Sequence, residues 1–203
     1  MGRSAMHLER LSHRLRSFRK DKEGVALVEF AILLPVLVVA YCGSVDICSM
    51  VTASRKVTQL TSSLADLTAR ASSVTAADVG NIFDAAQMVL APYDASKAKM
   101  TITNVVIDDK GVARVCWSSQ RNSVALARGA AVTLPASIKV PNTSVIMATA
   151  SYEFTPIAGY VVTGNVTLGN NPIYTRPRGA QPGGDLNIEQ VTLANTKPCP
   201  SFS

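Results

Sequence analysis

The strongest pattern in the chain is a long apolar run near its N-terminus. Over residues 25–45 the only ionisable side chains are Glu29, Tyr41 and Cys42. A helix rises about 1.5 Å per residue, so a run of this length crosses a hydrocarbon core of about 30 Å. We therefore expect residues 25–45 to form a transmembrane helix.

Beyond this run, apolar side chains recur at three- and four-residue intervals, which is typical of a helix with one apolar face. They are Val57, Leu60, Leu64, Leu67 and Ala71, and the opposite face carries Thr58, Ser62, Ser63 and Asp66. We expect this helix to continue the membrane segment and to end at Ser72-Ser73. Its apolar face is expected to pack on its own domain, with a partner's helix as the alternative.

A second, shorter helix is expected to follow. Thr75 and Asp78 have the spacing of a capping box, and the segment after them runs to about Leu90. Pro92 would end it.

From Lys99 the period changes to two, which predicts strands. Expected strands cover 100–107 and 112–117, joined by a turn at Asp108-Asp-Lys-Gly111, and then 145–154, 160–162 and 165–168. Adjacent acids in such a turn are read as turn formers rather than as a catalytic pair. The predicted fold class is therefore α+β, with helices followed by an antiparallel sheet.

The C-terminal tail, residues 169–203, is rich in Pro, Gly and Asn, so loops are expected there. The predicted organisation is a basic leader at 1–24, a membrane helix at 25–45, an exterior domain at 46–168 and this tail. Within the tail, Tyr174–Arg178 is expected to be a solvated loop, with a partner contact as the alternative.

Charge predicts the topology of the chain. Of its formal net charge of +6, four units lie in residues 1–24, where seven Lys and Arg side chains face three acids. Positive flanks stay in the cytoplasm, so residues 46–203 are expected outside it. The basic balance is therefore read as topology and lipid contact rather than as nucleic-acid binding.

Two cleaved signals are alternatives to a retained anchor. A secretory signal has a shorter apolar region and a small-residue cleavage site, which this run lacks. A lipoprotein signal needs a small residue before the cysteine, whereas Tyr41 precedes Cys42.

Glu29 is the unusual residue of the run, because a carboxylate at the centre of a membrane helix costs about 2.5–3.5 kcal/mol. It lies near the cytoplasmic edge and could be tolerated there by snorkelling. However, Gly24 followed by Glu29, between a basic leader and an apolar helix, resembles the type III leader of type IV pilin-like proteins. This resemblance implies cleavage by a prepilin peptidase between Gly24 and Val25, and a pairing of Glu29 with the new α-ammonium.

The segment Gly24-Val-Ala-Leu-Val-Glu-Phe-Ala-Ile-Leu-Leu-Pro35 is more closely similar to TadE/TadG-like proteins of the tight-adherence (Flp) pilus. Weaker likeness extends to 90–94, 132–135 and 174–178. Phe30 follows the glutamate where the short major pilin of that system usually has tyrosine, so the resemblance implies a minor pilin, or pseudopilin. The Asp-x-Ser-x-Ser motif of the von Willebrand module in larger members is missing.

Pro35 is expected to kink the membrane helix, because proline removes a backbone donor and clashes with the preceding turn. The resemblance to TadE/TadG-like proteins implies that Glu29 and Phe30 take part in assembly.

Cysteine positions predict one disulfide. Cys116 and Cys199 both lie outside the cytoplasm in the expected topology, where a disulfide persists, although two free thiols remain the alternative. Cys42 and Cys48 are read as small apolar residues.

Catalytic chemistry is not predicted. Both histidines, His7 and His13, lie in the leader, and no phosphate loop, Gly-x-Ser-x-Gly or Cys-x-x-Cys motif occurs. We expect no enzyme activity, cofactor or metal.

The sequence thus predicts a single-pass inner-membrane minor pilin with a periplasmic domain. Its expected partners are the prepilin peptidase, the major and other minor pilins, the inner-membrane assembly platform and membrane lipid. The alternative is an uncleaved membrane anchor whose exterior domain binds an envelope or secretion-system partner.

Overall fold

The computed structural model describes residues 22–156 and 164–199. The expected strand at 160–162 and most of the basic leader lie outside the described residues. The chain divides into two units, one comprising residues 1–47 and 157–163 and the other residues 48–156 and 164–203. Each unit is described by itself below.

One long helix, α2 (Lys22–Arg70), contains both the apolar run and the predicted exterior helix. In the first unit its large apolar side chains are exposed, for example Leu27 at 71% and Ile32 at 66%. The helix is long and apolar enough to cross a membrane. Pro35 lies inside it, and the helix assignment continues through this residue; the kink stays a prediction.

The second unit buries one face of α2. This stripe is largely apolar, and its polar members Thr61 and Thr68 donate their hydroxyls to backbone carbonyls four residues earlier. The prediction that this face packs on its own domain is confirmed, except that Leu67 is 37% exposed. The buried residues are Ala53, Val57, Leu60, Thr61, Leu64, Ala65, Thr68 and Ala69.

The second helix is α3 (Ala76–Gln87), which ends in a 3₁₀ turn, η1 (Met88–Leu90). The predicted capping box is present: the Asp78 amide donates to Thr75 Oγ1, and the Thr75 amide donates to Asp78 Oδ2. A second 3₁₀ turn, η2 (Ala95–Lys97), leads into the sheet.

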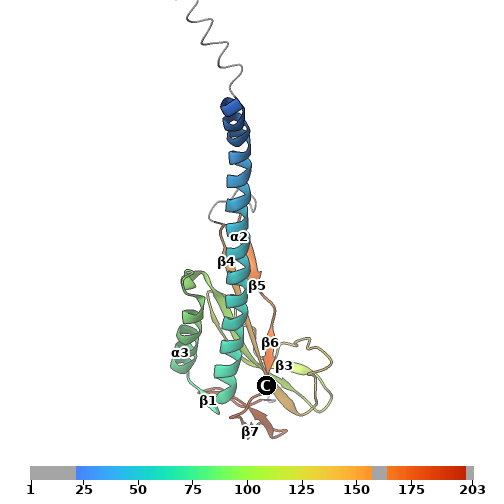
Figure 1. Ribbon diagram of the computed structural model, residues 1–203. Helices are drawn as coiled ribbons and strands as arrows, with labels where there is room; N and C mark the ends of the chain where they lie inside the picture. The colour runs from blue at the N-terminus through green and yellow to red at the C-terminus, as the bar shows by residue number, and fades with distance from the viewer. Residues whose placement is uncertain (1–21, 157–163, 200–203) are drawn as a thin grey trace, which may run out of the picture. The chain divides into compact units, whose positions relative to one another are not determined.

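The main sheet is antiparallel and has the order β3-β2-β4-β5. Figure 1 labels its strands β3, β4, β5 and β6. β4 is longer than β5 and β6 and pairs with both. β5 pairs with the last residues of β4, and β6 pairs with residues nearer its start. Alternate residues of a strand face opposite sides, so Ile102 and Val106 join the helices in one core while Val105 and Ile107 belong to a smaller cluster. The strands are β2 (Lys99–Ile107), β3 (Ala113–Arg121), β4 (Thr143–Phe154), β5 (Val166–Gly169) and β6 (Ile173–Thr175).

These elements confirm the predicted α+β class: an apolar N-terminal helix, a short helix and an antiparallel sheet. The turn at 108–111 also forms as predicted, with the Val112 amide donating to Asp108 Oδ1 at 2.7 Å. Gly111 takes a positive φ of 74° there, a conformation that glycine adopts readily.

The tail differs from the expected loops. It contributes β6, the hairpin β7 (Gln181–Gly183) with β8 (Ile188–Gln190), and β9 (Thr192–Leu193). β9 runs parallel to β1 (Ser73–Val74), which directly follows α2. Strands of two or three residues show no periodicity of their own, and β6 and β9 pair with partners distant in sequence, so the local pattern did not reveal them.

The close approach at Gly169 leads to a stability prediction. Gly169 has φ +86°, and a Cβ there would lie 2.5 Å from Ala150 O and 2.6 Å from a Val57 methyl. Backbone strain alone costs about 1–3 kcal/mol, so we expect Gly169→Ala to lower the free energy of unfolding by at least that amount in urea titrations.

The matched control is Gly80→Ala in the interior of α3. A Cβ at Gly80 meets nothing within 4 Å, and alanine favours a helix over glycine by about 0.5–1 kcal/mol. This variant should therefore be slightly more stable than the wild type. Equal effects of the two substitutions would contradict the account of Gly169.

The capping box predicts a pH dependence. The backbone amide and hydroxyl of Thr75 donate to the Asp78 carboxylate and hold its pKa below the ordinary value of 3.8. Its contribution to stability is therefore fully present above that ordinary value and is lost as the pH falls through the lowered pKa. Asp78→Ala should be less stable than the wild type at neutral pH, and the difference should shrink on acidification when unfolding is followed by circular dichroism. A difference that is constant with pH would exclude this carboxylate as its source.

Candidate functional site

The predicted processing and assembly residues all lie on the first turns of α2. A Cβ added at Gly24 would meet nothing within 4 Å, so crowding within the described chain does not require glycine there. Val25 and Phe30 are each 59% exposed. The Glu29 side chain is exposed too.

Glu29 has no partner of its own among the side chains that the structure describes. Residues four apart lie on the same face of a helix, so Glu29 is one turn from Val25 and also from Leu33. Both neighbours are apolar, and Leu33 is 56% exposed. An exposed carboxylate on an apolar helix needs either the membrane edge or a cationic partner.

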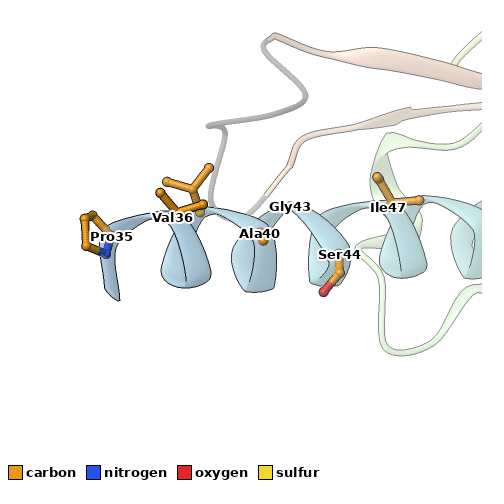
Figure 2. A pocket seen from close by; sticks show the side chains of 7 residues that line it. Pro35, Val36, Ala40, Gly43, Ser44 and Ile47 are labelled. Carbon is orange, nitrogen blue, oxygen red and sulfur yellow. The ribbon is translucent and has the colours of Figure 1, made fainter. Parts of the chain in front are cut away.

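Further along the same helix, a stripe of apolar and small residues borders a hollow of about 630 Å³, and three of its seven members, Ala40, Gly43 and Ser44, are small. Figure 2 shows Val36, Ala40, Gly43, Ser44 and Ile47 following one another along α2 after Pro35. The Ser44 hydroxyl donates to Tyr41 O at 2.7 Å, so its polar group is satisfied within the helix. Small residues at such spacing allow close approach of another helix in a membrane.

Asp46 is an acid that sequence reasoning missed. It directly follows the apolar run, yet it is only 1% exposed. Its position could have revealed it. An acid directly after a membrane span lies where burial of its charge would be costly, so it is unusual there.

The expected solvated loop at Tyr174–Arg178 is wrong for Tyr174 and Thr175, which belong to β6, whereas the side chains of Arg176 and Arg178 are exposed. The backbone of this part of the tail contacts the C-terminal end of α2. The amides of Arg178 and Gly179 donate to Ala69 O at 2.7 and 3.3 Å. The Arg178 guanidinium lies 3.5 Å from Asp66 Oδ1, and Asp66 also pairs with Arg70. Carbonyls at a helix end lack partners within the helix, so the tail supplies them.

Cys116 in β3 and Cys199 near the end of the tail are joined by a disulfide. Their Cα atoms are 5.7 Å apart although 83 residues separate them. Cys42 and Cys48 are free thiols.

Gln190, which sequence reasoning also missed, holds the cysteine-bearing tail in place. Its Oε1 accepts from the Cys199 amide at 3.0 Å, and its Nε2 donates to Cys199 O at 2.6 Å and Gly183 O at 3.1 Å. The side chain is fully buried. A glutamine in a polar tail gives no sequence signal of such a role.

In residues 22–156 and 164–199, no group of three or more His, Cys, Asp or Glu side chains is placed to hold a metal ion.

A protein-family model matches the part of the chain that contains most of α2. The model described as TadE-like protein matches residues 24–66. The match begins at Gly24, includes Glu29, Phe30 and Pro35, and ends near the C-terminal end of α2. The match covers about a fifth of the chain, and it is a likeness to a family associated with the Tad pilus system. No curated protein and no solved structure matches the chain.

The buried contacts of Gln190 lead to a prediction. Gln190→Ala should leave the Cys199 amide and carbonyl without partners, and an unsatisfied buried polar group costs about 1–3 kcal/mol. We expect a lower urea midpoint of unfolding, and faster reduction of the disulfide by dithiothreitol. Gln181→Ala, at an exposed position of β7, is the control and should change neither. An unchanged reduction rate in Gln190→Ala would show that this side chain does not hold the tail.

Proposed function

We propose that this protein is a minor pilin, or pseudopilin, that takes part in assembly of a tight-adherence (Flp) pilus. The observation that carries the proposal is the TadE-like match over residues 24–66, on a helix whose first part is apolar and exposed. A pilus subunit uses such a helix for two purposes: as an anchor in lipid before assembly and as a packing surface in the filament afterwards.

A peptidase on the cytoplasmic side would cut the chain between Gly24 and Val25 and so remove the basic leader. The new α-ammonium of Val25 would then lie one helical turn from Glu29 on the same face. An ion pair at the membrane edge offsets part of the desolvation cost of both groups. The pair would form within one subunit, or between Glu29 and the terminus of a neighbour.

The periplasmic domain would prime, cap or join the filament, with the prepilin peptidase, other pilins and the inner-membrane assembly platform as partners. Pro35 would loosen the helix by freeing a backbone carbonyl. Within the stripe from Val36 to Ile47, the small residues Ala40, Gly43 and Ser44 would allow close approach of a neighbouring helix.

The second candidate is an uncleaved anchor with a partner-binding exterior domain. The exposed Glu29 favours the pilin instead, because a simple membrane anchor does not explain why a carboxylate lies in the apolar run. The two functions differ in the mature N-terminus.

The test is N-terminal sequencing of the full-length protein purified from membranes, made with and without a prepilin peptidase. We expect a chain that begins at Val25 only when the peptidase is present, and an intact leader in Gly24→Ala. Gly80→Ala is the matched control and should be processed normally.

A Glu29→Gln variant separates processing from assembly. It should still be cut, but its amount in the sheared pilus fraction should fall by roughly an order of magnitude if a buried ion pair is lost. Retention of the leader in cells that contain the peptidase would overturn the pilin proposal and leave the uncleaved anchor.

A further inference from the structure

A groove lies beside β3, the edge strand of the main sheet, where α3 faces it. The groove has a volume of about 390 Å³, and we call it the β3 groove. Gly80 lies on its α3 side, and a Cβ there would meet nothing within 4 Å. Glycine inside a helix is less favourable than alanine, and crowding within the described chain does not require it here. The groove is lined by Ala76, Val79, Gly80 and Phe83 of α3, residues 118–121 of β3, and Ala125.

Only the first half of the outer edge of β3 is paired. The Val115 amide donates to Ala130 O at 2.9 Å, and the Arg128 guanidinium donates to Cys116 O at 3.2 Å. Beyond that point β3 pairs with β2 alone. In the part of the chain that the structure describes, no backbone hydrogen bond reaches residues 117–121 from outside these two strands. A strand edge with unpaired amides and carbonyls is a template for a further strand.

The lining of the groove suits an uncharged strand. Arg121 is the charged residue of the lining, and its guanidinium already pairs with Asp84 and donates to Gly80 O at 3.2 Å. The other lining side chains are apolar or neutral. Ala76 and Gly80 are small and lie one turn apart on α3, so a strand added to β3 can approach the helix closely.

The chain that follows β3 carries a segment with matching chemistry. We call residues 123–127, Ser-Val-Ala-Leu-Ala, the donor segment. Val124 is 84% and Leu126 41% exposed, and Ala125 and Ala127 are exposed as well. Within the described chain, residues 124–126 make no backbone hydrogen bond. Large and small side chains alternate, so a strand formed here has one face of small side chains that suits a close neighbour.

Contacts at both ends fix where the donor segment begins and ends. Asn122, just before it, has a φ of 54° and donates its side-chain amide to Ser96 O at 2.8 Å. Arg128, just after it, holds Cys116 O. Between these two residues, Ala125 borders the groove, but the segment does not pair with β3. One molecule thus displays both an unpaired strand edge and an unpaired segment that suits it.

We propose that two copies of this protein associate by exchanging these segments, so that the donor segment of each copy pairs with β3 in the β3 groove of the other. A two-fold interface requires a surface that contains both complementary parts, and the groove and the donor segment supply them. The pairing would also cover a strand edge that is otherwise open to other chains. Each groove takes one short segment, so we expect a weak, reversible association. The exchange uses the second unit alone and does not depend on the pilin function.

Cross-linking between two single-cysteine variants of the full-length protein in detergent micelles tests the exchange. Both variants carry Cys42→Ala and Cys48→Ala and keep the disulfide. One has Ser119→Cys in the groove, and the other, with a larger affinity tag, has Ala125→Cys in the donor segment. A short bismaleimide then joins thiols that come close. The control for the second variant is Val112→Cys, an exposed position just before β3 begins.

We expect several-fold more cross-linked heterodimer from the 119 and 125 mixture than from the 119 and 112 mixture. Gly80→Leu in both partners should fill the groove and lower the yield to the control level. Ala77→Leu, at an exposed position of α3 that does not line the groove, is the matched control and should leave the yield unchanged. The circular dichroism spectrum of each variant shows whether it folds.

Equal yields in the two mixtures would overturn the exchange. A high yield that Gly80→Leu does not lower would overturn it too, because the copies would then meet elsewhere. Amide hydrogen exchange at residues 124–126 identifies the occupant of the groove. The proposal predicts protection that grows with protein concentration, whereas protection at every concentration would mean that the segment closes its own groove and would contradict the exchange.

Discussion

Burial of one face of α2 between Ala53 and Ala69 is the interaction on which the second unit depends. Complete burial of a side chain such as Leu60 or Leu64 contributes about 1.5–3 kcal/mol, as an upper estimate. The same helix exposes nearly every large apolar side chain before Val45. One helix therefore needs two different surroundings, a protein core for its second part and lipid or neighbouring helices for its first.

The C-terminal tail secures the end of that helix. The amides of Arg178 and Gly179 satisfy Ala69 O, β9 pairs with β1 just beyond the helix, and the disulfide attaches Cys199 to β3. A Cβ at Gly179 would lie 2.2 Å from Arg70 O, so only glycine fits this approach. These contacts join the last described residues to the first elements of the domain.

Sequence periodicity predicted the elements that have enough length to show it. The stripe from Val57 to Leu64, the Thr75–Asp78 capping box and the β2–β3 hairpin all follow from local spacing. The tail strands did not, because β6 and β9 are short and gain their stability from distant partners. Gln190 was missed for a related reason: its burial depends on tertiary neighbours. For the candidate site, Gly24 and Glu29 could be recognised only by resemblance, since within this chain their geometry imposes no requirement for glycine or for a carboxylate.

The central claim is that one uninterrupted helix joins the exposed apolar residues of the first unit to the core of the second. Hydrogen–deuterium exchange of the full-length protein in lipid nanodiscs tests it most directly, read at the amides of residues 46–50, where the two units meet in the sequence. The account predicts that these amides exchange as slowly as those of the flanking turns. Fast exchange at 46–50 between protected flanks would contradict it, because it would mean two helices joined by a hinge.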